Sequence, residues 1–568
     1  MNDVKALYEL WRTKATLDPD LLAELDSVAG NDDEISDRFY KSLEFGTGGL
    51  RGVIGAGTNR MNVYTVGQAT QGLADYLNEA FDEPSVAIAY DSRIKSDVFA
   101  KEAAGVLAAN GVKVYIYPEL MPTPMLSFTV RRLHCSSGIV ITASHNPSKY
   151  NGYKCYDYRG YQMTDEAAAR TYEYMKKVDV FTGIKRMSFD EALACDAVDF
   201  IEDWVKDEFT EAVLSKSLNR DAVAASGIKL LYTPLNGTGN KPVRRTLIKL
   251  GVKELRVVPT QEHPDGNFPT CPYPNPEIRQ VFEQGLAMTD EFPADLMIAT
   301  DPDCDRVGIA VRDGGEYKLM TGNEVGAMLT EYLLSTLSER GALPQNPVIF
   351  KTIVTTPLVT AICRQYGAEM HDLLTGFKYI GEGITELEEK GEADRFILGF
   401  EESYGYLCGT HVRDKDAVVG AMLITEMAAV YKQRGMTLWQ FMQSLYEKYG
   451  FYLNRLDNFA FEGESGMETM ARMMEQLRQE PPAEINGSRV VWTGDYRSGI
   501  TTDGETGLPK SNVLSYRCEN GDSVIVRPSG TEPKIKVYIT AKAETREQAN
   551  EELVAVSGSM KQLLGIEA

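Results

Sequence analysis

The sequence predicts an α/β protein built from several domains, and three observations support this prediction. Short runs of apolar, often β-branched residues alternate with helical patterns, which indicates βαβ units with parallel or mixed sheets. The chain has 568 residues, and at roughly 150 residues per domain about four domains are expected. Polar or glycine-rich segments follow several of the apolar runs. Such segments lie at the carboxyl ends of strands, where functional loops gather in α/β proteins.

The strand and helix pattern begins after a helical N-terminal segment. Residues 1–40 have a polar, helical pattern and predict an appendage ahead of the first domain. Residues 85–90 (SVAIAY) predict a strand, and residues 97–109 predict the helix that follows it. Further strands are expected wherever similar short apolar runs recur, at residues 112–116, 138–142, 229–232, 295–299, 347–350 and 396–400.

Two segments depart from this alternation. Residues 263–277 (HPDGNFPTCPYPNPE) are rich in proline, and proline cannot join a central ladder, so a loop inside the second unit is expected. From about residue 450 the pattern changes, with strand-like segments at 489–495 (RVVWTGD) and 523–540 (SVIVRPSGTEPKIKVYIT). These two segments predict a smaller α+β module at the C-terminal end.

The charge balance argues against some classes of binding partner. The chain has 59 basic and 82 acidic residues and a net charge of −23, which argues against non-specific binding to nucleic acid or to an anionic membrane surface. A small anionic substrate remains compatible, provided that local cations and backbone amides outweigh the global field. The basic residues embedded in glycine-rich turns supply such sites.

Composition also indicates the compartment. No window approaches the ~20 consecutive apolar residues that span a bilayer, and the start (MNDVKALYELWRTKA) lacks the apolar core and cleavage site of a secretory signal. The eight cysteines are scattered without CxxC pairs. They predict reduced thiols in a cytoplasmic protein, with neither a disulfide framework nor a zinc site.

A serine and a histidine stand where a buried strand is expected to end. Ser144 and His145 follow the apolar run at 138–142 within TASHNP. The segment has no G-x-S-x-G elbow, and His145 is poorly placed to act as a base for its own neighbour. One interpretation is a capped turn, since Ser, Asn and Pro all favour turns. The other is that Ser144 accepts a phosphoryl group, which requires a metal and cations nearby.

Three carboxylates alternate directly after the run ADLMIAT. Asp301, Asp303 and Asp305 lie within DPDCDR. A calcium EF-hand is excluded, because loop positions six and twelve are Arg306 and Arg312 rather than glycine and glutamate. Three carboxylates without His or Cys suit a hard cation such as Mg²⁺, which takes further ligands from phosphate and water. The alternative is a solvated acidic turn.

Four other segments have the composition of ligand-binding loops. In RPSGTEPK (527–534), the Arg527 guanidinium can bind phosphate oxygens in bidentate fashion, and hydroxyls and amides can line an anion; an ordinary hairpin loop is the alternative. FGTGGLRG (45–52) presents Arg51 among glycines, and LTGFK (374–378) is another strand-end loop with Thr375 and Gly376. FEESYG places Glu401 and Ser403 two residues apart, where they can hydrogen-bond adjacent sugar hydroxyls. Lys415 in HVRDKDA is a possible proton donor.

Taken together and in this order, these motifs resemble the α-D-phosphohexomutase superfamily, which includes phosphoglucomutases and phosphomannomutases. The matching segments are FGTGGLRG, TASHNP, DPDCDR, FEESYG and RPSGTEPK, and they span almost the whole chain. The resemblance implies four domains around a central cleft: three similar α/β/α domains with mixed sheets and a smaller C-terminal α+β domain that closes over the substrate. The domain limits that we expect are 1–205, 206–325, 326–450 and 451–568.

The resemblance also implies roles for individual residues. Ser144 would be the phosphoserine, next to His145, and its phosphate would join Asp301, Asp303 and Asp305 in binding Mg²⁺. The substrate would be a small phosphosugar, with glucose 1,6-bisphosphate as intermediate and activator. Catalysis would also involve Lys154, near the reacting hydroxyl, Lys415 and Arg51. The remaining residues implied to bind substrate are Arg306, Thr375, Gly376, Glu401, Ser403 and, for the phosphate that is not reacting, Arg527, Ser529, Gly530 and Thr531.

Two departures from the family motifs bear on the function. The metal loop reads DPDCDR where DGDGDR is common, but its three aspartates and its arginine remain. The sugar loop reads EESYG, without the histidine of a GExSGH loop. EES followed by RDKD resembles the glucose-directed branch, in which a lysine serves as general acid/base; Lys154 and Lys415 are both candidates.

The expected function is that of a phosphoglucomutase, working as a monomer or weak homodimer. Phosphopentomutase, phosphomannomutase and glucose-1,6-bisphosphate synthase are the alternatives within this chemistry. A non-catalytic sugar-phosphate-binding protein is the alternative from a different class. It predicts that the serine, metal or phosphate loop is broken, whereas all three are intact in the sequence.

Overall fold

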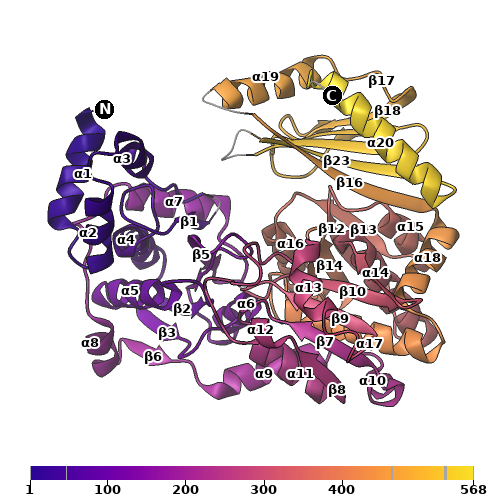
Figure 1. Cartoon of the computed structure of the whole chain (residues 1–568), viewed down its shortest axis with the longest axis horizontal. Coiled ribbons are helices and arrows are strands. Elements are labelled where there is room, and N and C mark those ends of the chain that lie inside the picture. Colours follow the sequence, from indigo (N-terminus) through magenta and orange to yellow (C-terminus); the bar gives the residue numbers. More distant parts are fainter. Residues whose placement is uncertain (1, 47, 462–464, 530–533, 567–568) are drawn as a thin grey trace.

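The computed structural model describes residues 2–46, 48–461, 465–529 and 534–566. Four β-sheets follow one another along the chain, and the first three lie between layers of helices (Figure 1). These three sheets mix parallel and antiparallel pairs, and the fourth is antiparallel. The prediction of three α/β/α domains followed by a C-terminal domain of different architecture is therefore confirmed.

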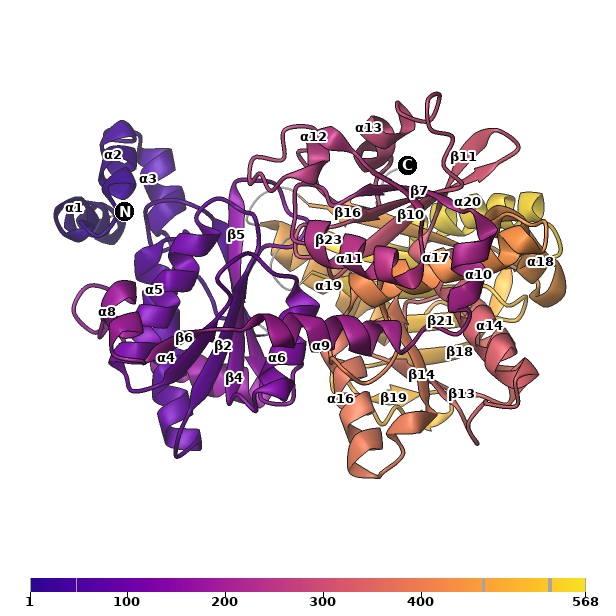
Figure 2. The same ribbon diagram turned by 90° about the horizontal axis from the view of Figure 1, so that it is seen from below.

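The N-terminal segment is helical, as its pattern indicated. Its helices are α1 (Asn2–Lys14), α2 (Pro19–Ser27) and α3 (Asp32–Phe39), and they lie on the outer side of the first domain (Figure 2). Trp11 is fully buried there and makes edge contacts with the rings of Phe39, Tyr64 and Phe181 at 5.4–5.9 Å between centroids. The appendage is thus packed against the first domain by an aromatic cluster.

The first sheet has the order β1-β5-β4-β2-β3-β6. Strands β2, β3, β4 and β6 are parallel, while β5 returns antiparallel to β4 and pairs with β1. The β4–β5 connection contains Ser144, and β5 contains Lys154. The elements are β1 (Gly49–Val53), α4 (Val63–Ala80), β2 (Ser85–Tyr90), α5 (Ser96–Ala109), β3 (Lys113–Ile116), α6 (Thr123–Arg132), β4 (Ser137–Ile141), β5 (Tyr150–Asp157), α7 (Asp165–Met175), α8 (Phe189–Ala194) and β6 (Val198–Phe200).

The second sheet has the order β11-β10-β9-β7-β8, and the aspartate loop connects β9 to β10. The proline-rich residues 263–277 form turns and loop, as expected. The elements are α9 (Asp203–Leu214), α10 (Arg220–Ser226), β7 (Lys229–Thr233), α11 (Asn240–Leu250), β8 (Glu254–Val257), α12 (Pro259–Glu262), η1 (Arg279–Phe282), α13 (Glu283–Leu286), β9 (Leu296–Thr300), β10 (Val307–Asp313) and β11 (Glu316–Met320).

The third sheet has the order β13-β12-β14-β15. In α14, Gly326 lets the helix approach β14, because a Cβ there would stand 1.9 Å from the ring of Phe400. This close contact fixes the strand that ends at Glu401. The elements are α14 (Gly322–Glu339), β12 (Val348–Thr352), α15 (Leu358–Tyr366), β13 (Glu369–Leu373), α16 (Phe377–Glu389), η2 (Ala393–Arg395), β14 (Phe396–Glu401), β15 (Gly405–Leu407), α17 (Ala417–Gln433) and α18 (Leu438–Tyr449).

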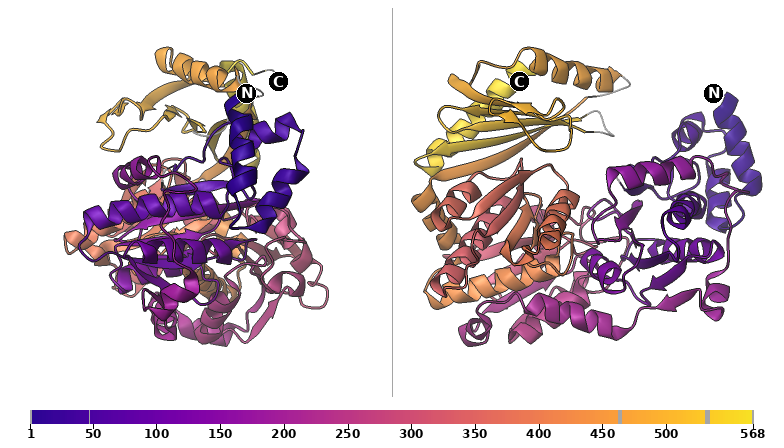
Figure 3. Two further views of the ribbon diagram at one scale, coloured as in Figure 1. Left: turned by 90° about the vertical axis from the view of Figure 1, so that its left-hand side faces the viewer. Right: turned by 180° about the vertical axis from the view of Figure 1, so that it is seen from behind.

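The C-terminal domain is an antiparallel sheet with helices on one side, and this sheet lies over the third domain (Figure 3). Its strand order is β16-β23-β22-β21-β18-β19-β20, with β17 paired to β18. The elements are β16 (Phe451–Ala460), α19 (Ser465–Gln479), β17 (Glu484–Ile485), β18 (Ser488–Asp495), β19 (Ile500–Thr501), β20 (Gly504–Glu505), β21 (Leu514–Cys518), β22 (Ser523–Pro528), β23 (Lys534–Ala543) and α20 (Arg546–Leu563).

The structure also describes the cysteines and the apolar character of the helices. All eight cysteines are free thiols, and seven of them are buried. Across the described residues, no helix combines the length and the apolar character needed to cross a bilayer.

Candidate functional site

The serine loop places Ser144 against the aspartate loop of the second domain. Strand β4 is buried throughout and ends at Ile141. Ser144 is 4% exposed and has a left-handed backbone with φ 50°, a strained conformation for a residue other than glycine. Thr142 Oγ1 accepts a hydrogen bond from the Ser144 amide at 2.8 Å. The Ser144 hydroxyl donates to Asp301 Oδ2 at 2.7 Å, across 157 positions of sequence.

A buried arginine that the sequence analysis missed holds this loop in place. The Arg93 guanidinium donates to the carbonyl oxygens of Ser144 and Asn146 at 2.5 Å, and to those of Pro147 and Tyr150 at 3.0 Å. Asp91 faces Arg93 at 3.4 Å, and neither side chain is exposed. Arg93 therefore supplies donors for the backbone of the strained turn. Its signal in the sequence was the charged segment Asp91-Ser92-Arg93 directly after strand 85–90.

The three aspartates converge in a buried cluster. Asp301, Asp303 and Asp305 each offer a carboxylate oxygen within 4.8 Å of the other two, and all three residues are at most 1% exposed. Thr123, at the start of α6, donates to Asp303 Oδ2 at 3.0 Å. Among the described residues, Asp303 Oδ1 and Asp305 Oδ1 lack a hydrogen-bond partner. Two unpartnered, buried carboxylate oxygens in an all-oxygen donor set fit a hard divalent cation.

The ionisation of the cluster supports this fit. Burial, reinforced by the charges of Asp303 and Asp305, raises the pKa of Asp301 well above its usual value. The pKa of Asp305 is also raised, by burial and by Asp303. For Asp303, burial raises the pKa, but the charge and hydrogen bond of Lys154 outweigh burial and the net pKa is lowered. The protein alone therefore does not fully stabilise three charged carboxylates at this position, and a bound cation would supply the missing stabilisation.

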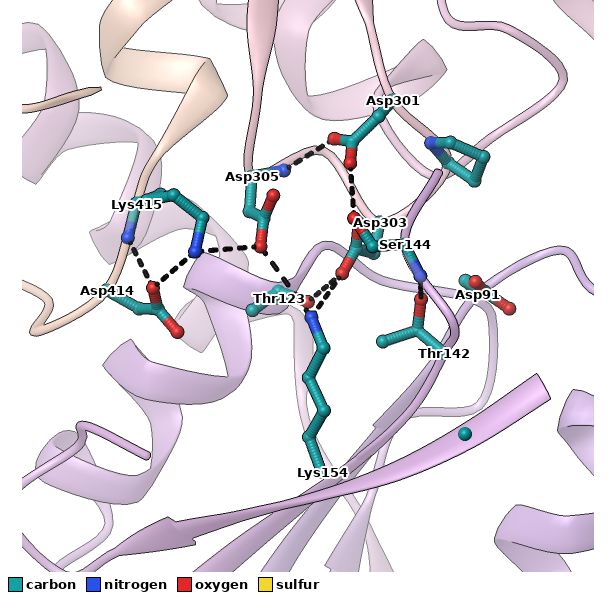
Figure 4. A network of polar contacts seen from close by, with 12 residues as sticks. Asp91, Thr123, Thr142, Ser144, Lys154, Asp301, Asp303, Asp305, Asp414 and Lys415 are labelled. Carbon is teal, nitrogen blue, oxygen red and sulfur yellow. Dashed lines mark hydrogen bonds and ion pairs between the residues drawn. The ribbon is translucent and has the colours of Figure 1, made fainter. Parts of the chain in front are cut away.

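Two lysines from different domains contact the aspartate cluster and share Asp305 (Figure 4). Lys154 Nζ lies 2.9 Å from Asp303 and 3.7 Å from Asp305, and Lys415 Nζ lies 3.3 Å from Asp305. Burial lowers the pKa of each lysine, but the neighbouring carboxylates outweigh burial and the pKa of each is raised. Both lysines are therefore charged near neutral pH.

Lys415 is held by two residues that no motif identified. Asp414 Oδ1 accepts hydrogen bonds from the Lys415 amide at 2.7 Å and from Lys415 Nζ at 3.1 Å. Asp414 Oδ2 accepts a hydrogen bond from the Tyr156 hydroxyl at 2.5 Å. Tyr156 belongs to β5 of the first domain, so this contact joins the first and third domains beside the aspartates.

The other predicted residues of the first two domains surround the serine. His145 Nδ1 lies 3.2 Å from Ser144 Oγ. Burial, reinforced by Arg306 and Arg51, lowers the pKa of His145 well below its usual value, so the imidazole is neutral. Arg51 donates to Asn146 Oδ1 at 3.4 Å. The Arg306 guanidinium pairs with Glu277 at 2.8 Å, and its amide donates to Asp301 Oδ1 at 3.0 Å.

Residues of all four domains line one cleft of about 960 Å³. Glu401 Oε1 accepts a hydrogen bond from the Gly376 amide at 2.9 Å, which joins two of the predicted substrate loops. The Thr375 hydroxyl is buried and has no partner among the described residues, and it lines the same cleft. The predicted residues that line the cleft are His145, Arg306, Thr375, Gly376, Glu401, Ser403, Lys415 and Arg527.

The phosphate loop is only partly described. Arg527 lines the cleft, and the Ser529 amide donates to the Lys534 carbonyl at 2.7 Å. Gly530 and Thr531 lie outside the described residues. Lys536 and Arg455 also line the cleft on the C-terminal side, and neither was singled out from the sequence. Lys536 alternates with Lys534 along β23, a strand pattern that could have identified it.

Strained backbone recurs in the loops that form this site. Cys304 in the aspartate loop has φ 54°, and Tyr404 in the sugar loop has φ 67°. Cys304 stands where DGDGDR has its second glycine, so the left-handed conformation persists with a side chain in place. The Cys304 side chain is fully buried, and this packing offsets the backbone strain.

Comparison with family models assigns all four parts of the chain. Residues 42–180, 207–315 and 321–449 match the phosphoglucomutase/phosphomannomutase α/β/α domains I, II and III. Residues 469–556 match the C-terminal domain of the same family. The helices α1–α3 lie ahead of the first matched segment.

Individual relatives agree with these matches. The chain is 36% identical over 524 residues to a phosphoglucomutase of Staphylococcus saprophyticus, covering 91% of this chain and 94% of that protein. It is 34% identical over 542 residues to a phosphoglucomutase of Staphylococcus aureus, covering 94% and 95%.

Solved structures share the fold at lower sequence identity. A putative phosphomannomutase from Thermus thermophilus superposes with a TM-score of 0.68 at 22% identity, over 92% of this chain and 99% of that one. The phosphoglucomutase pp63/parafusin of Paramecium, in its open form, gives 0.69 at 17% identity, over 92% and 95%.

Proposed function

The chain belongs to the phosphoglucomutase/phosphomannomutase family and is a phosphohexomutase, an isomerase that works by intramolecular phosphotransfer; from this premise we propose that it interconverts glucose 1-phosphate and glucose 6-phosphate. The observation that carries the proposal is the Ser144 hydroxyl, which lies 2.7 Å from a buried three-carboxylate cluster. This serine also stands beside a cleft to which all four domains contribute.

The reaction that we propose passes through a phosphoserine. An oxygen of the free sugar hydroxyl attacks the phosphorus on Ser144, the Oγ–P bond breaks, and the hydroxyl proton passes through a side chain of the site to the leaving Ser144 Oγ. The product is glucose 1,6-bisphosphate, which turns around in the cleft. Ser144 Oγ then attacks the other phosphate, the bond between that phosphorus and the sugar oxygen breaks, and the serine proton passes back to the sugar oxygen. Such transfers depend chiefly on positioning and charge neutralisation.

Asp301, Asp303 and Asp305 are the residues that would hold Mg²⁺. When bound, the ion would supply charge neutralisation for the phosphoryl oxygens next to Ser144. The protein supplies further positive charge around Ser144 from Arg51 and Arg306. Arg93 does not face the substrate; it holds the backbone of the serine turn through four carbonyl oxygens.

Lys415 is the residue that we favour for moving the hydroxyl proton. Lys415 lines the cleft, whereas Lys154, on β5, is not among the residues that line it and contacts Asp303. Asp414 and Tyr156 fix the position of Lys415. Because its raised pKa keeps Lys415 charged, we propose that it works as a relay: it gives a proton to the oxygen that leaves and takes the proton of the attacking hydroxyl in exchange.

Glucose is the sugar that we propose, and two observations support it. The loop containing Glu401 and Ser403 has the EES form, and the relatives that cover nine-tenths of the chain are described as phosphoglucomutases.

The free thiols suit a reducing compartment, and we propose that the enzyme works in the cytoplasm.

A coupled assay tests the sugar preference. Purified protein is supplied with glucose 1-phosphate, mannose 1-phosphate or ribose 1-phosphate, each with Mg²⁺ and with or without glucose 1,6-bisphosphate. The proposal requires the largest kcat/KM for glucose 1-phosphate and stimulation by the bisphosphate. A larger kcat/KM for the mannose or ribose compound would refute the assignment to glucose while leaving the phosphotransfer chemistry intact.

A further inference from the structure

A second cavity, of about 450 Å³, lies between the third domain and the C-terminal sheet. On the side of the third domain it is lined by β12, β13 and α15, and on the other side by one face of the sheet from β16 to β18. Figure 1 shows β13 and α15 directly beneath this sheet. The volume falls within the range of roughly 300–1,000 Å³ that is usual for small-molecule sites.

This cavity adjoins the catalytic cleft but is separate from it. A small buried apolar cluster, which includes Ile353, Val354 and Tyr538, packs between the two domains. Val354 and Tyr538 line both spaces, so they form part of the wall between them. The Tyr538 hydroxyl also interacts with Arg527 of the catalytic cleft. An occupant of the second cavity would therefore touch the wall that interacts with Arg527.

The cavity is strongly positive, although the whole chain is acidic. Its lining includes four cations, Lys351, Arg364, Arg517 and Lys542, and one carboxylate, Asp372. Asp372 pairs with Lys351. Among the described residues, Arg364, Arg517 and Lys542 have no carboxylate partner within ion-pair distance. In a protein of net charge −23, three unpaired cations around one hollow indicate an anionic ligand.

Aromatic rings accompany these charges. Tyr452, Trp492 and Tyr496 line the same cavity. The Arg517 guanidinium lies over the indole of Trp492 at 4.1 Å from the ring centroid, and Lys542 lies over Tyr452 at 5.4 Å. Aromatic faces next to guanidinium groups are the surfaces on which nucleic-acid bases stack.

We propose that this cavity binds a nucleoside di- or triphosphate. The phosphates would lie between Arg364 on α15 and Arg517 on β21, and the base would stack in the aromatic part around Trp492. Because Arg364 belongs to the third domain and Arg517 to the C-terminal domain, the bound phosphates link the two domains. Turning of the sugar bisphosphate requires the C-terminal domain to move. The bound nucleotide restrains this movement and thereby lowers kcat. This effect on turnover rests on the proposed function, whereas binding does not.

The experiment compares two double variants of the full-length protein. Arg364→Ala/Arg517→Ala removes one cation from each wall of the cavity. Arg434→Ala/Arg489→Ala removes the same number of charges from the same two domains, but outside the cavity. Calorimetric titrations with ATP and with inorganic triphosphate measure binding, and circular dichroism checks that both variants are folded. These arginines are outside the catalytic cleft, so basal turnover should be unchanged in both variants.

The expected result is ATP binding to the wild type and to the control, with the affinity of Arg364→Ala/Arg517→Ala reduced by about tenfold or more, since two charge-assisted contacts are lost. Trp492→Ala should weaken the binding of ATP but leave the affinity for inorganic triphosphate unchanged. ATP binding that is equal in both double variants would place the nucleotide elsewhere and overturn the proposal, as would the absence of binding to the wild type. Triphosphate that binds as tightly as ATP would refute the role of the base.

Discussion

Substitution of Arg93 tests whether this residue fixes the conformation of the loop that contains Ser144. The substitution Arg93→Met keeps much of the side-chain volume and removes every donor from the four carbonyl oxygens that Arg93 contacts. It also leaves Asp91 buried without its cationic neighbour. Breaking a buried ion pair on one side costs about 3–5 kcal/mol. We therefore expect the free energy of unfolding to fall by about that amount.

The same substitution should impair catalysis in the molecules that remain folded. Ser144 sits in a strained turn with φ 50°, and without Arg93 its hydroxyl loses its fixed distance to Asp301. A displacement of about 1 Å at a reacting group can cost about 10²-fold in rate, so kcat should fall by at least that factor. Arg93→Lys should recover part of the stability but less of the rate, because an ammonium lacks the planar fork of a guanidinium.

Arg60 offers a matched control in the same domain. It is also buried, it bonds to the carbonyl oxygens of Asp37 and Asn59, and it pairs with the Asp37 carboxylate. Arg60→Met should lower stability, as measured by urea denaturation, but leave kcat of the folded enzyme near the wild-type value. If Arg93→Met unfolds at the wild-type urea concentration and turns over at the wild-type rate, Arg93 does not position Ser144.

Three further predictions concern the metal site, the sugar loop and the proton carrier. Mg²⁺ should stabilise the wild type against unfolding, by about 2.7 kcal/mol at a hundredfold excess over its Kd, and should leave Asp301→Asn unstabilised; equal stabilisation would exclude the cluster as the site. Burial and the charge of Glu401 raise the pKa of Glu402 to about 7. Between pH ~4.5, where this glutamate ionises in the unfolded chain, and pH about 7, Glu402 is therefore protonated in the folded state and ionised in the unfolded state. Relative to the wild type, Glu402→Gln should therefore become more stable as the pH rises through this window, by up to about 3 kcal/mol, whereas a difference independent of pH would contradict the shift. Lys415→Met should reduce kcat by about 10²-fold or more with little change in KM, and a larger loss in Lys154→Met would transfer the proton-carrying role to Lys154.

The fold was accessible from the sequence because strand and helix patterns are local. The run at 85–90 and the helix pattern at 97–109 reappear as β2 (Ser85–Tyr90) and α5 (Ser96–Ala109). The segment 523–540 contains parts of two paired strands, β22 and β23, with the phosphate loop between them. Periodicity shows such segments directly, because residues on one face of a strand recur every second position.

The site was predictable where polar residues follow a buried strand. Ser144 and the aspartates stand just beyond β4 and β9, and the structure brings them into contact. Contacts between distant segments were not predictable. Tyr156 and Asp414 are 258 positions apart, and Arg93 meets carbonyl oxygens more than 50 positions away. Such pairs depend on how domains pack, and a single sequence contains no local signal for domain packing.

The most direct measurement is the state of Ser144 during turnover. The protein is incubated with glucose 1,6-bisphosphate and Mg²⁺, and peptide mass spectrometry locates any phosphate; glucose 1-phosphate is then added in excess. We expect one phosphoryl group on Ser144, its loss to the added sugar, and no turnover by Ser144→Ala. A phosphate on another residue, or turnover by Ser144→Ala at the wild-type rate, would contradict the transfer of phosphate through this serine.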